Sequence, residues 1–416
     1  MARIKLIAFG CSNNLAESEI MAGLLKEAGH DIVDSNEDIA IISICNVKGP
    51  SFNKGLNAAR KAKEKVIFAG CVPSYQLPKI RKEFPSASVV STHNIALICG
   101  AVEELLKGKR NEIIEKKAEK KICLPRIRKN KAIGILPVST GCLGQCSYCA
   151  VKAIKGELIS YPAEDIVKEV ENAVKEGCRE IWITAQDTGC YGMDIGSDLP
   201  SLLSKVLEVK GEFKVRLGMA NPGFVKEYAN ELIKVFKNEK MFRFLHIPIQ
   251  SGSSKVLNEM NRHYTAGEII LIVEKFRKAI PDIAIATDII VGFPSETEKD
   301  FLESVKIIKK IKPSVMNLNR YWAMPFTKAG EMKQLRSEVL SDRCSRMLKV
   351  FRKIALDEKK KAVGKEMNIL IDGKRENNVC LGRTDSYALV VAKGKFSLGQ
   401  KANVKIKKAT ANYLIA

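Results

Sequence analysis

Apolar residues occur in short runs that alternate with helical patterns over most of the chain. Three runs near the N-terminus lack polar alternation and are bounded by turn residues, which is typical of buried parallel strands. They are IKLIAF (4–9), DIAIISI (38–44) and KVIFA (65–69). Between the first two lies a helical pattern, AESEIMAGLLKEAG, which ends on a glycine as many helices do. We therefore predict a small doubly wound α/β domain over residues 1–106.

The same alternation returns after a break and repeats six times. The strand candidates between residues 134 and about 330 are AIGILPVST, EIWITA, FKVRLGM, FRFLHIPI, IAIATDIIVGF and VMNLNRYW, and helical patterns follow the first five. Six βα units without a dinucleotide fingerprint favour a barrel or partial barrel over an open nucleotide-binding sheet. A long charged helix is expected over residues 331–364. We assign residues 134–361 to this central domain.

Two basic segments flank the central domain. Residues 107–133 hold eleven Lys or Arg against three Glu and close with a proline and an apolar stretch. We interpret them as a linker on the surface, either an electrostatic contact for nucleic acid or a purely solvated connector. After Gly364 the chain turns into short strands separated by Gly, Asn and Asp turns, so residues 362–416 are expected to form a small β-barrel. Such basic barrels commonly bind RNA, although a basic cap on the main domain is an alternative.

The overall charge points to a polyanionic partner. The chain of 416 residues carries 69 Lys and Arg against 47 Asp and Glu, a net charge of +22. Neutralising phosphates releases counterions and favours binding, so nucleic acid is the expected partner, with a merely solvated basic surface as the alternative. The sequence has no signal-peptide pattern and no apolar run near the roughly 20 residues that span a bilayer. We expect a cytoplasmic protein without a membrane partner, whose twelve cysteines are metal ligands or core residues.

Three cysteines share one context in the N-terminal domain. Cys11, Cys45 and Cys71 each follow one of the three predicted strands. The carboxyl ends of parallel strands meet at the edge of the sheet where ligands bind, so the three thiols should converge. An iron–sulfur cluster held by three cysteines would keep one iron with an open coordination position. The alternative is that one or two of them are ordinary buried cysteines.

A second set of cysteines is closely spaced. In STGCLGQCSYCA, Cys142, Cys146 and Cys149 follow the first strand of the central domain with the pattern Cys-x3-Cys-x2-Cys. Barrels of this kind keep their active sites at that end of the strands. A structural zinc site or an ordinary iron–sulfur cluster takes four protein ligands. The spacing therefore predicts a metal centre whose fourth position is filled by something else, with a zinc ion and a distant fourth ligand as the alternative.

With Tyr148 before its last cysteine, this stretch resembles the signature of the radical S-adenosylmethionine (SAM) enzymes, in which SAM fills the fourth iron position. The resemblance extends over nearly the whole chain to the methylthiotransferase family, whose members have an N-terminal cluster domain, a partial (βα)6 barrel and a C-terminal TRAM domain that binds RNA. The segments AQDTGCYGMDIG, RLGMANP, FLHIPIQSGSSKVLNEMNRHY and ATDIIVGFPSETEKDF resemble its archaeal and eukaryotic subgroup. That subgroup acts on N6-threonylcarbamoyladenosine next to the anticodon of tRNA.

The resemblance implies an α/β enzyme with two [4Fe–4S] clusters and SAM as cofactors. The cluster at Cys142, Cys146 and Cys149 would bind and cleave SAM, and the cluster at Cys11, Cys45 and Cys71 would carry the sulfur. The product would be the 2-methylthio derivative of the modified adenosine. The expected partners are the anticodon arm of tRNA, a low-potential electron donor such as ferredoxin or flavodoxin, and a sulfur donor.

The same resemblance suggests residues for the SAM and substrate pocket. Those that we expect to contact SAM are Tyr148, Gln186, Asp187, Arg216, Gln250, Ser251, Asp288 and Gly292. Gln186 and Asp187 would hold the SAM amino group, although Asp187 would equally serve to cap the next turn. Arg216 would meet the SAM carboxylate or form a structural ion pair. Ser251 would start the next helix as its N-cap and present backbone N–H groups to an anion.

Several residues have alternative assignments. Asp288 and the turn from Gly292 to Glu296 would contact adenine or methionine, and Arg262 would approach cofactor or nucleic acid. The cysteines without paired spacing are treated as non-ligands: Cys99, Cys123, Cys178, Cys190, Cys344 and Cys380. Alternative acceptors for the same chemistry are isopentenylated adenosine in tRNA and an aspartate of a ribosomal protein. A non-enzymatic alternative is an RNA-binding iron–sulfur protein.

Overall fold

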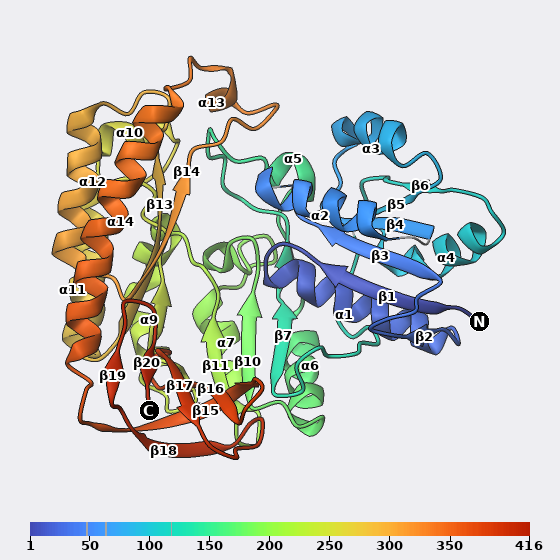
Figure 1. Cartoon of the computed structure of the whole chain (residues 1–416). Coiled ribbons are helices and arrows are strands. Elements are labelled where there is room, and N and C mark those ends of the chain that lie inside the picture. Colours follow the sequence, from blue (N-terminus) through green and yellow to red (C-terminus); the bar gives the residue numbers. More distant parts are fainter. Residues whose placement is uncertain (47–48, 63–64, 118) are drawn as a thin grey trace.

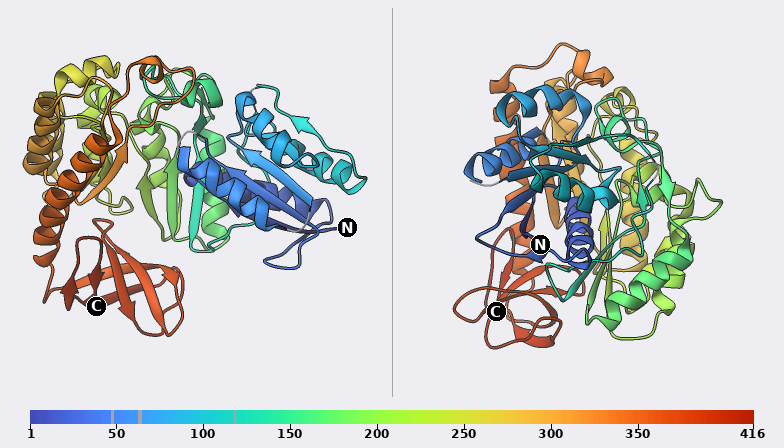
Figure 2. Two further views of the ribbon diagram at one scale, coloured as in Figure 1. Left: turned by 45° about the horizontal axis from the view of Figure 1, so that its top comes forward. Right: turned by 90° about the vertical axis from the view of Figure 1, so that its right-hand side faces the viewer.

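The computed structural model describes residues 1–416 except 47–48, 63–64 and 118 (Figure 1). Three units follow one another along the chain: an N-terminal α/β unit, a central arc of parallel strands with helices outside it, and a C-terminal sheet. The N-terminal unit lies beside the central arc and the C-terminal unit lies below it, as the two views of Figure 2 also show. The α/β class with a small C-terminal β domain is thereby confirmed.

The N-terminal unit is a six-stranded parallel sheet in the order β2-β1-β3-β4-β5-β6. Its strands are β1 (Arg3–Ala8), β2 (Asp31–Ile32), β3 (Ile39–Ile44), β4 (Lys65–Gly70), β5 (Ser88–Ser91) and β6 (Glu112–Ile113). One face packs against α1 (Ser12–Glu27) and α4 (Ile98–Leu106), and the other against α2 (Gly49–Lys61) and α3 (Leu77–Glu83). The order reverses between β1 and β3, so their carboxyl ends form the switch point at which such sheets bind ligands. The prediction of a doubly wound sheet is confirmed.

Six parallel strands form the central arc, in the order β7-β10-β11-β12-β13-β14. They are β7 (Ile133–Pro137), β10 (Glu180–Thr184), β11 (Lys214–Leu217), β12 (Phe244–His246), β13 (Ala284–Val291) and β14 (Val315–Arg320). The outer helices are α6 (Ala163–Lys175), α7 (Leu199–Glu208), α9 (Ala229–Phe236), α11 (Ala266–Ala279), α12 (Glu298–Ile311) and α14 (Ser337–Lys360). The central unit is therefore a partial barrel, as predicted.

Shorter elements shape the carboxyl ends of these strands. They are β8 (Ser139–Thr140), α5 (Val151–Lys155), β9 (Ile159–Ser160), η3 (Thr188–Cys190), α8 (Pro222–Val225), α10 (Ser254–Glu259) and α13 (Lys328–Glu331). Strand β8 pairs with β9 in antiparallel fashion. This pairing closes the base of the segment that carries the cysteine pattern and α5.

The C-terminal unit is a six-stranded sheet in the order β18-β15-β16-β17-β20-β19. Its strands are β15 (Glu366–Lys374), β16 (Val379–Thr384), β17 (Leu389–Lys393), β18 (Lys401–Lys405), β19 (Lys408–Ala409) and β20 (Leu414–Ile415). This unit packs against the amino-terminal ends of the central strands: Leu370 joins an apolar cluster with Phe242 and Phe244, and the Tyr387 hydroxyl donates to Glu180 Oε1 at 2.5 Å. The small β domain is thus docked onto the arc.

The basic linker lies partly inside the protein, which corrects the prediction of a surface connector. The side chains of Lys121, Arg126 and Arg128 are 3–5% exposed. Arg126 Nε lies 2.9 Å from Glu169 Oε1 on α6. Burial of these cations is possible because each reaches a carboxylate on a neighbouring helix. Within the described part of the chain we find no helix with the length and apolar character that crossing a bilayer requires.

Candidate functional site

The first three predicted ligands lie together at the edge of the N-terminal sheet. Strands β1, β3 and β4 are neighbours in the sheet, and Cys11, Cys45 and Cys71 lie just beyond their carboxyl ends. Cys45 and Cys71 are buried, whereas Cys11 is exposed. A hydrogen bond with Cys45, together with burial, holds the pKa of the Cys71 thiol well above its usual value. The protein packed around the Cys11 sulfur, together with the nearby Cys71, also raises the pKa of this thiol, although the residue as a whole is exposed. We call this group the N-terminal triplet.

Glycines and one asparagine allow the three thiols to come together. Gly10 has a φ of +136°, and a Cβ there would lie 2.7 Å from the Cβ of Cys45. A Cβ on Gly70 would lie 2.9 Å from the Ile44 carbonyl oxygen. Asn14, on the first turn of α1, accepts a hydrogen bond from Cys11 at 3.4 Å and donates to the Ile44 carbonyl at 3.1 Å. The backbone is therefore built to bring the ends of β1 and β3 into contact.

The second set of cysteines lies in the loop between β8 and α5. The backbone N–H of Gly144 donates to Cys142 Sγ at 3.3 Å, and Arg262 Nη1 donates to Cys146 Sγ at 3.2 Å. Burial and the neighbouring Cys146 raise the pKa of Cys149 to about 12. Donors aimed at sulfur favour the thiolate, which is the form that binds metal. We call these three residues the central triplet, and the donors to Cys142 and Cys146 suit thiolate ligands of an iron–sulfur cluster.

Cys190 lies beside the central triplet, although no spacing in the sequence pairs it with another cysteine. Among the residues that the structure describes, the potential ligand atoms of Cys142, Asp187 and Cys190 lie within 4.8 Å of one another. A hydrogen bond with Cys190 lowers the pKa of Cys142 and, with burial, strongly raises that of Cys190. Cys190 Sγ donates to the Asp187 carbonyl oxygen at 3.4 Å and lies beside Cys142, and its exclusion from the ligand set stays a prediction. Cys190 directly follows Gln186–Gly189, a segment expected at the SAM pocket, and this position in the sequence could have indicated that it lies near the central triplet.

Arg262 is held in place by its own partners. Its Nε donates to the Tyr264 hydroxyl at 2.7 Å and its Nη2 to the Pro248 carbonyl at 3.3 Å. Tyr148 packs against an apolar group that includes Val256 and Phe293, and burial raises its pKa well above the usual value. Arg262 therefore presents a fixed positive charge to the central triplet. The sequence alone had allowed it to approach either the cofactor or nucleic acid.

Two glutamines offer buried acceptors near the ends of the barrel strands. Gln186 Oε1 and Gln250 Oε1 are buried without a hydrogen-bond partner among the described residues. Gln250 also has a φ of +69°, a conformation that is strained for a side chain of its size. Buried polar atoms are nearly always paired, so these oxygens fit donors of a bound ligand. The SAM amino group, which donates only, has the required chemistry.

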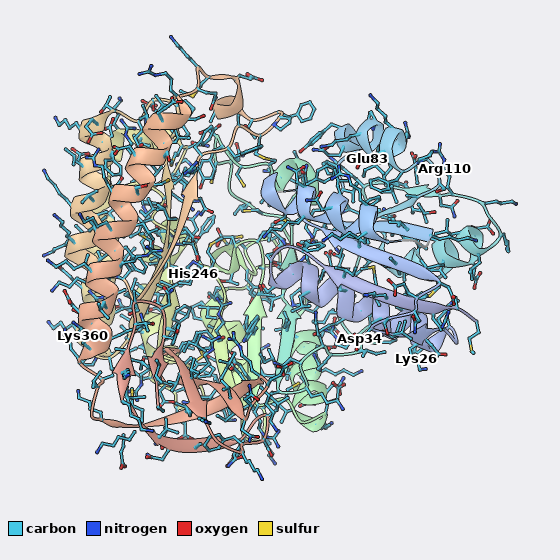
Figure 3. All side chains as sticks on the ribbon, viewed as in Figure 1. Lys26, Asp34, Glu83, Arg110, His246 and Lys360 are labelled. Carbon is cyan, nitrogen blue, oxygen red and sulfur yellow. The ribbon has the colours of Figure 1, made fainter. Side chains whose placement is uncertain are left out.

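Two predicted carboxylates have protein partners. Asp187 Oδ1 accepts hydrogen bonds from the backbone N–H groups of Gly189 at 2.9 Å and Asn221 at 3.0 Å, so the capping role applies. Burial raises the pKa of Asp187. Asp288 Oδ2 lies 2.6 Å from His246 Nε2 on the adjacent strand. Figure 3 places His246 at the inner side of the central arc.

The N-cap prediction for Ser251 is wrong. Helix α10 begins at Ser254, and Ser253 is its N-cap, accepting from the Val256 N–H. Ser251 is fully buried, with its Oγ 3.3 Å from Ser304 Oγ on α12. The reason is Gly252: a Cβ there would lie 2.5 Å from the Glu303 carbonyl oxygen, so this stretch packs against α12 before the helix starts.

Gly292 and Arg216 have surroundings that the sequence did not indicate. A Cβ on Gly292 would lie 2.4 Å from Leu340 Cγ on α14, so close helix packing accounts for this glycine. The Arg216 guanidinium lies over the rings of Trp182, Phe244 and Tyr387, at 5.5, 5.6 and 5.8 Å from their centroids. Arg216 thus contacts aromatic rings, whereas the SAM carboxylate or a structural ion pair was expected from the sequence. Contacts of Gly292 and Arg216 with SAM stay predictions.

The two triplets face one another across α5. Ala150 and Ile154 pack against Cys71, together with Met324 from the loop after β14. Ser12 Oγ, next to Cys11, lies 2.7 Å from Thr184 Oγ1 at the end of β10. The carboxyl ends of β1 and β4 thus lie against the segments that follow the carboxyl ends of the central strands.

Comparison with known proteins adds family information. The chain matches the radical SAM superfamily over residues 136–308, uncharacterized protein family UPF0004 over 3–92 and the TRAM domain over 360–416. It is 37% identical to a probable threonylcarbamoyladenosine tRNA methylthiotransferase of Pyrococcus horikoshii, covering 100% of this chain and 99% of the relative. The corresponding protein of Archaeoglobus fulgidus is 39% identical, with 99% and 98% covered. The threonylcarbamoyladenosine tRNA methylthiotransferase of Danio rerio is 35% identical, with 100% and 78% covered.

A solved structure resembles the fold. The radical SAM methyltransferase TsrM of Kitasatospora setae, with cobalamin and a [4Fe–4S] cluster bound, has a TM-score of 0.56 and 12% sequence identity. The alignment covers 79% of this chain and 74% of TsrM. At this identity the likeness concerns the fold alone.

Proposed function

The chain belongs to the threonylcarbamoyladenosine tRNA methylthiotransferases of the radical SAM superfamily, and on that premise we propose that it converts N6-threonylcarbamoyladenosine, next to the anticodon of tRNA, to its 2-methylthio derivative. The observation that carries the proposal is 35–39% identity to relatives of that name over the length of this chain. Two cysteine triplets at facing sheet edges support it, because the reaction joins two separate chemistries. The matching TRAM domain agrees with an RNA substrate.

We assign the central triplet to a [4Fe–4S] cluster completed by SAM and the N-terminal triplet to a second [4Fe–4S] cluster. When bound, these groups supply a radical that removes the C2 hydrogen of adenine and a methylated sulfur that couples to that carbon. The chain's own part is to hold and insulate them. The guanidinium of Arg262 holds a positive charge next to the sulfur of Cys146. Gln186 and Gln250 offer acceptors to the SAM amino group, and α5 fills the space between the triplets.

The reaction requires partners that we propose on chemical grounds. A low-potential electron donor such as ferredoxin or flavodoxin reduces the clusters, and a separate sulfur donor replaces the sulfur consumed at each turnover. A cytoplasmic location is proposed because tRNA and such donors are found there.

Exposed lysines of the C-terminal domain are expected to contact tRNA phosphates. Lys405, Lys407 and Lys408 are exposed around the turn between β18 and β19. Replacing all three with Ala should weaken tRNA binding and flatten the slope of log K against log salt by about 0.7–0.9 for each phosphate that is no longer neutralised. Binding measured at several salt concentrations checks this. Deleting the whole domain is a poorer test, since it would uncover Phe244 and Glu180, which the domain covers.

A matched control is present on an outer helix. Lys306 and Lys309 are exposed on α12. Changing both to Ala removes two positive charges, against three in the C-terminal variant, and should leave the salt slope nearly unchanged. Equal slopes for the two variants would mean that the C-terminal domain has no special part in RNA binding.

The proposed function is tested by the nucleosides of cellular tRNA. Mass spectrometry of tRNA from cells with and without the protein should show the 2-methylthio derivative of threonylcarbamoyladenosine only when the protein is present. Supplying a Cys146→Ala variant should not restore it. A change in methylthiolated isopentenyladenosine, or in a ribosomal-protein aspartate with unchanged tRNA, would assign the chain to another acceptor.

A further inference from the structure

A buried group of charges lies beside the N-terminal triplet, where α1 meets the end of α5. Glu17 Oε1, on α1, accepts hydrogen bonds from Lys121 Nζ at 2.8 Å, Lys155 Nζ at 2.9 Å and Thr92 Oγ1 at 2.6 Å. Thr92 Oγ1 accepts in turn from Lys155 at 2.6 Å and from Lys121 at 3.0 Å. All four residues are at most 4% exposed. Nothing in the proposed reaction requires ionised groups here.

The charges in this group do not balance. One carboxylate faces two ammonium groups, and an uncompensated buried charge is costly. Lys121 has a second acidic neighbour, Glu119. Lys155 has no second carboxylate among the described groups that favour its charge; the others are Cys71 and Cys11. The preceding residue, Ile154, packs against Cys71, so Lys155 lies beside the N-terminal triplet.

The two lysines differ in their electrostatic surroundings. Burial lowers the pKa of Lys121. Burial also opposes the charge on Lys155, but Cys71, Glu17 and Cys11 outweigh it and raise the pKa of this lysine. The nearby His93 packs with Nε2 2.9 Å from the Ile154 carbonyl, and burial lowers its pKa, so it adds no further positive charge at neutral pH. Lys155 is therefore held by Glu17 and Thr92 next to the N-terminal triplet, where the adjacent Ile154 packs against Cys71.

We propose that Lys155 is a positioning residue for the N-terminal cluster, whose negative charge it compensates and whose reduction potential it raises. The inference rests on the proposed function in taking Cys11, Cys45 and Cys71 as cluster ligands. Three thiolates carry more negative charge than an oxidised [4Fe–4S] core carries positive charge, and reduction adds one more electron. An ammonium close by in a medium of low dielectric stabilises the reduced form preferentially, and cluster potentials follow local charge.

The position of Lys155 also links the two sites. It lies at the end of α5, which begins two residues after Cys149, and its ammonium is bound to α1, which begins one residue after Cys11. The short helix α5 thus begins at the loop of the central triplet and ends with Lys155 at the N-terminal triplet. The contact joins residues 138 positions apart in the sequence.

The test uses the full chain with Cys142, Cys146 and Cys149 changed to Ala, so that the remaining cluster signal comes from the N-terminal triplet. A redox titration followed by electron paramagnetic resonance gives its midpoint potential. At the potential where this parent is half reduced, adding Lys155→Met should lower the ratio of reduced to oxidised cluster at least tenfold, which is about 59 mV for a one-electron couple. Lys155→Arg, which keeps the charge, should stay within threefold of the parent.

Lys121→Met is the matched control, since Lys121 shares both Glu17 and Thr92 with Lys155. Either single change leaves Glu17 paired with the other lysine, so both variants should fold, as circular dichroism would verify. Lys121→Met should change the ratio less than threefold. Loss of iron from Lys155→Met but not from Lys121→Met supports the same conclusion.

Equal shifts in the two Met variants, or none in either, would overturn the role of Lys155 and leave the proposed tRNA modification standing. A parent protein that binds no iron would instead overturn the assignment of a cluster to the N-terminal triplet, and the inference with it. The two failures are therefore distinguishable without measuring turnover.

Discussion

Cys146→Ala should abolish the reductive cleavage of SAM while leaving tRNA binding largely intact. Removing this thiolate takes one of three protein ligands from the central cluster and leaves Arg262 Nη1 without its sulfur acceptor at 3.2 Å. Losing an outer-shell partner of a metal ligand already costs roughly 10–100-fold, so loss of the ligand itself should exceed that range. Chromatography of 5′-deoxyadenosine formed by reduced, reconstituted protein measures the effect. The basic C-terminal domain, which is expected to bind RNA, lies at the opposite ends of the barrel strands.

Cys190→Ala is the matched control for this prediction. Its thiol is fully buried beside Cys142 and is a cysteine of the same pocket, but it is expected to donate a hydrogen bond and not to bind iron. The variant should keep its iron and cleave SAM within a few-fold of the parent rate. If Cys190→Ala lost iron as completely as Cys146→Ala, the three-cysteine assignment of the central cluster would have to be abandoned.

The convergence of cysteines was predictable because parallel topology dictates it. Once apolar runs without alternation identified β1, β3 and β4, any residues after them had to meet at one sheet edge. Cys11, Cys45 and Cys71 needed no further information. The compact spacing of the central triplet was equally local. The strand pattern did not determine where the helix after β12 begins. Because Gly252 packs closely on α12, the N-cap is Ser253 and not Ser251.

Buried charge was not predictable from the same patterns. Lys121 belongs to a segment with eleven basic residues, which favours a solvated surface, and its partner Glu17 lies 104 positions earlier. Local composition carries no signal for an ion pair over that separation. The same holds for Tyr387 of the C-terminal domain, whose ring centroid lies 5.8 Å from the Arg216 guanidinium on β11. Long-range polar pairing is where sequence reasoning fails for this chain.

Cys45→Ala should stop methylthiolation and spare SAM cleavage, because it removes a ligand from the N-terminal cluster alone. Cys45 is the better choice than Cys71, which packs against Ala150 and Ile154 and whose loss would disturb the helix after the central triplet. Iron per chain should fall to about half that of the parent if two clusters of equal size are present. In the same reaction, 5′-deoxyadenosine should still form while the methylthio nucleoside disappears.

The control for Cys45→Ala is Cys99→Ala, in the same domain. Cys99 is half-buried on α4 against the sheet face that α1 also covers. Its removal costs packing but no ligand, so iron content and both products should stay close to those of the parent. Simultaneous loss of SAM cleavage and thiolation in Cys45→Ala, with Cys99→Ala unaffected, would mean that the triplets form one interdependent centre. Loss of thiolation alone is what two separate sites require, since the variant keeps Cys71 against Ala150 and Ile154 and keeps Ser12 Oγ beside Thr184 Oγ1.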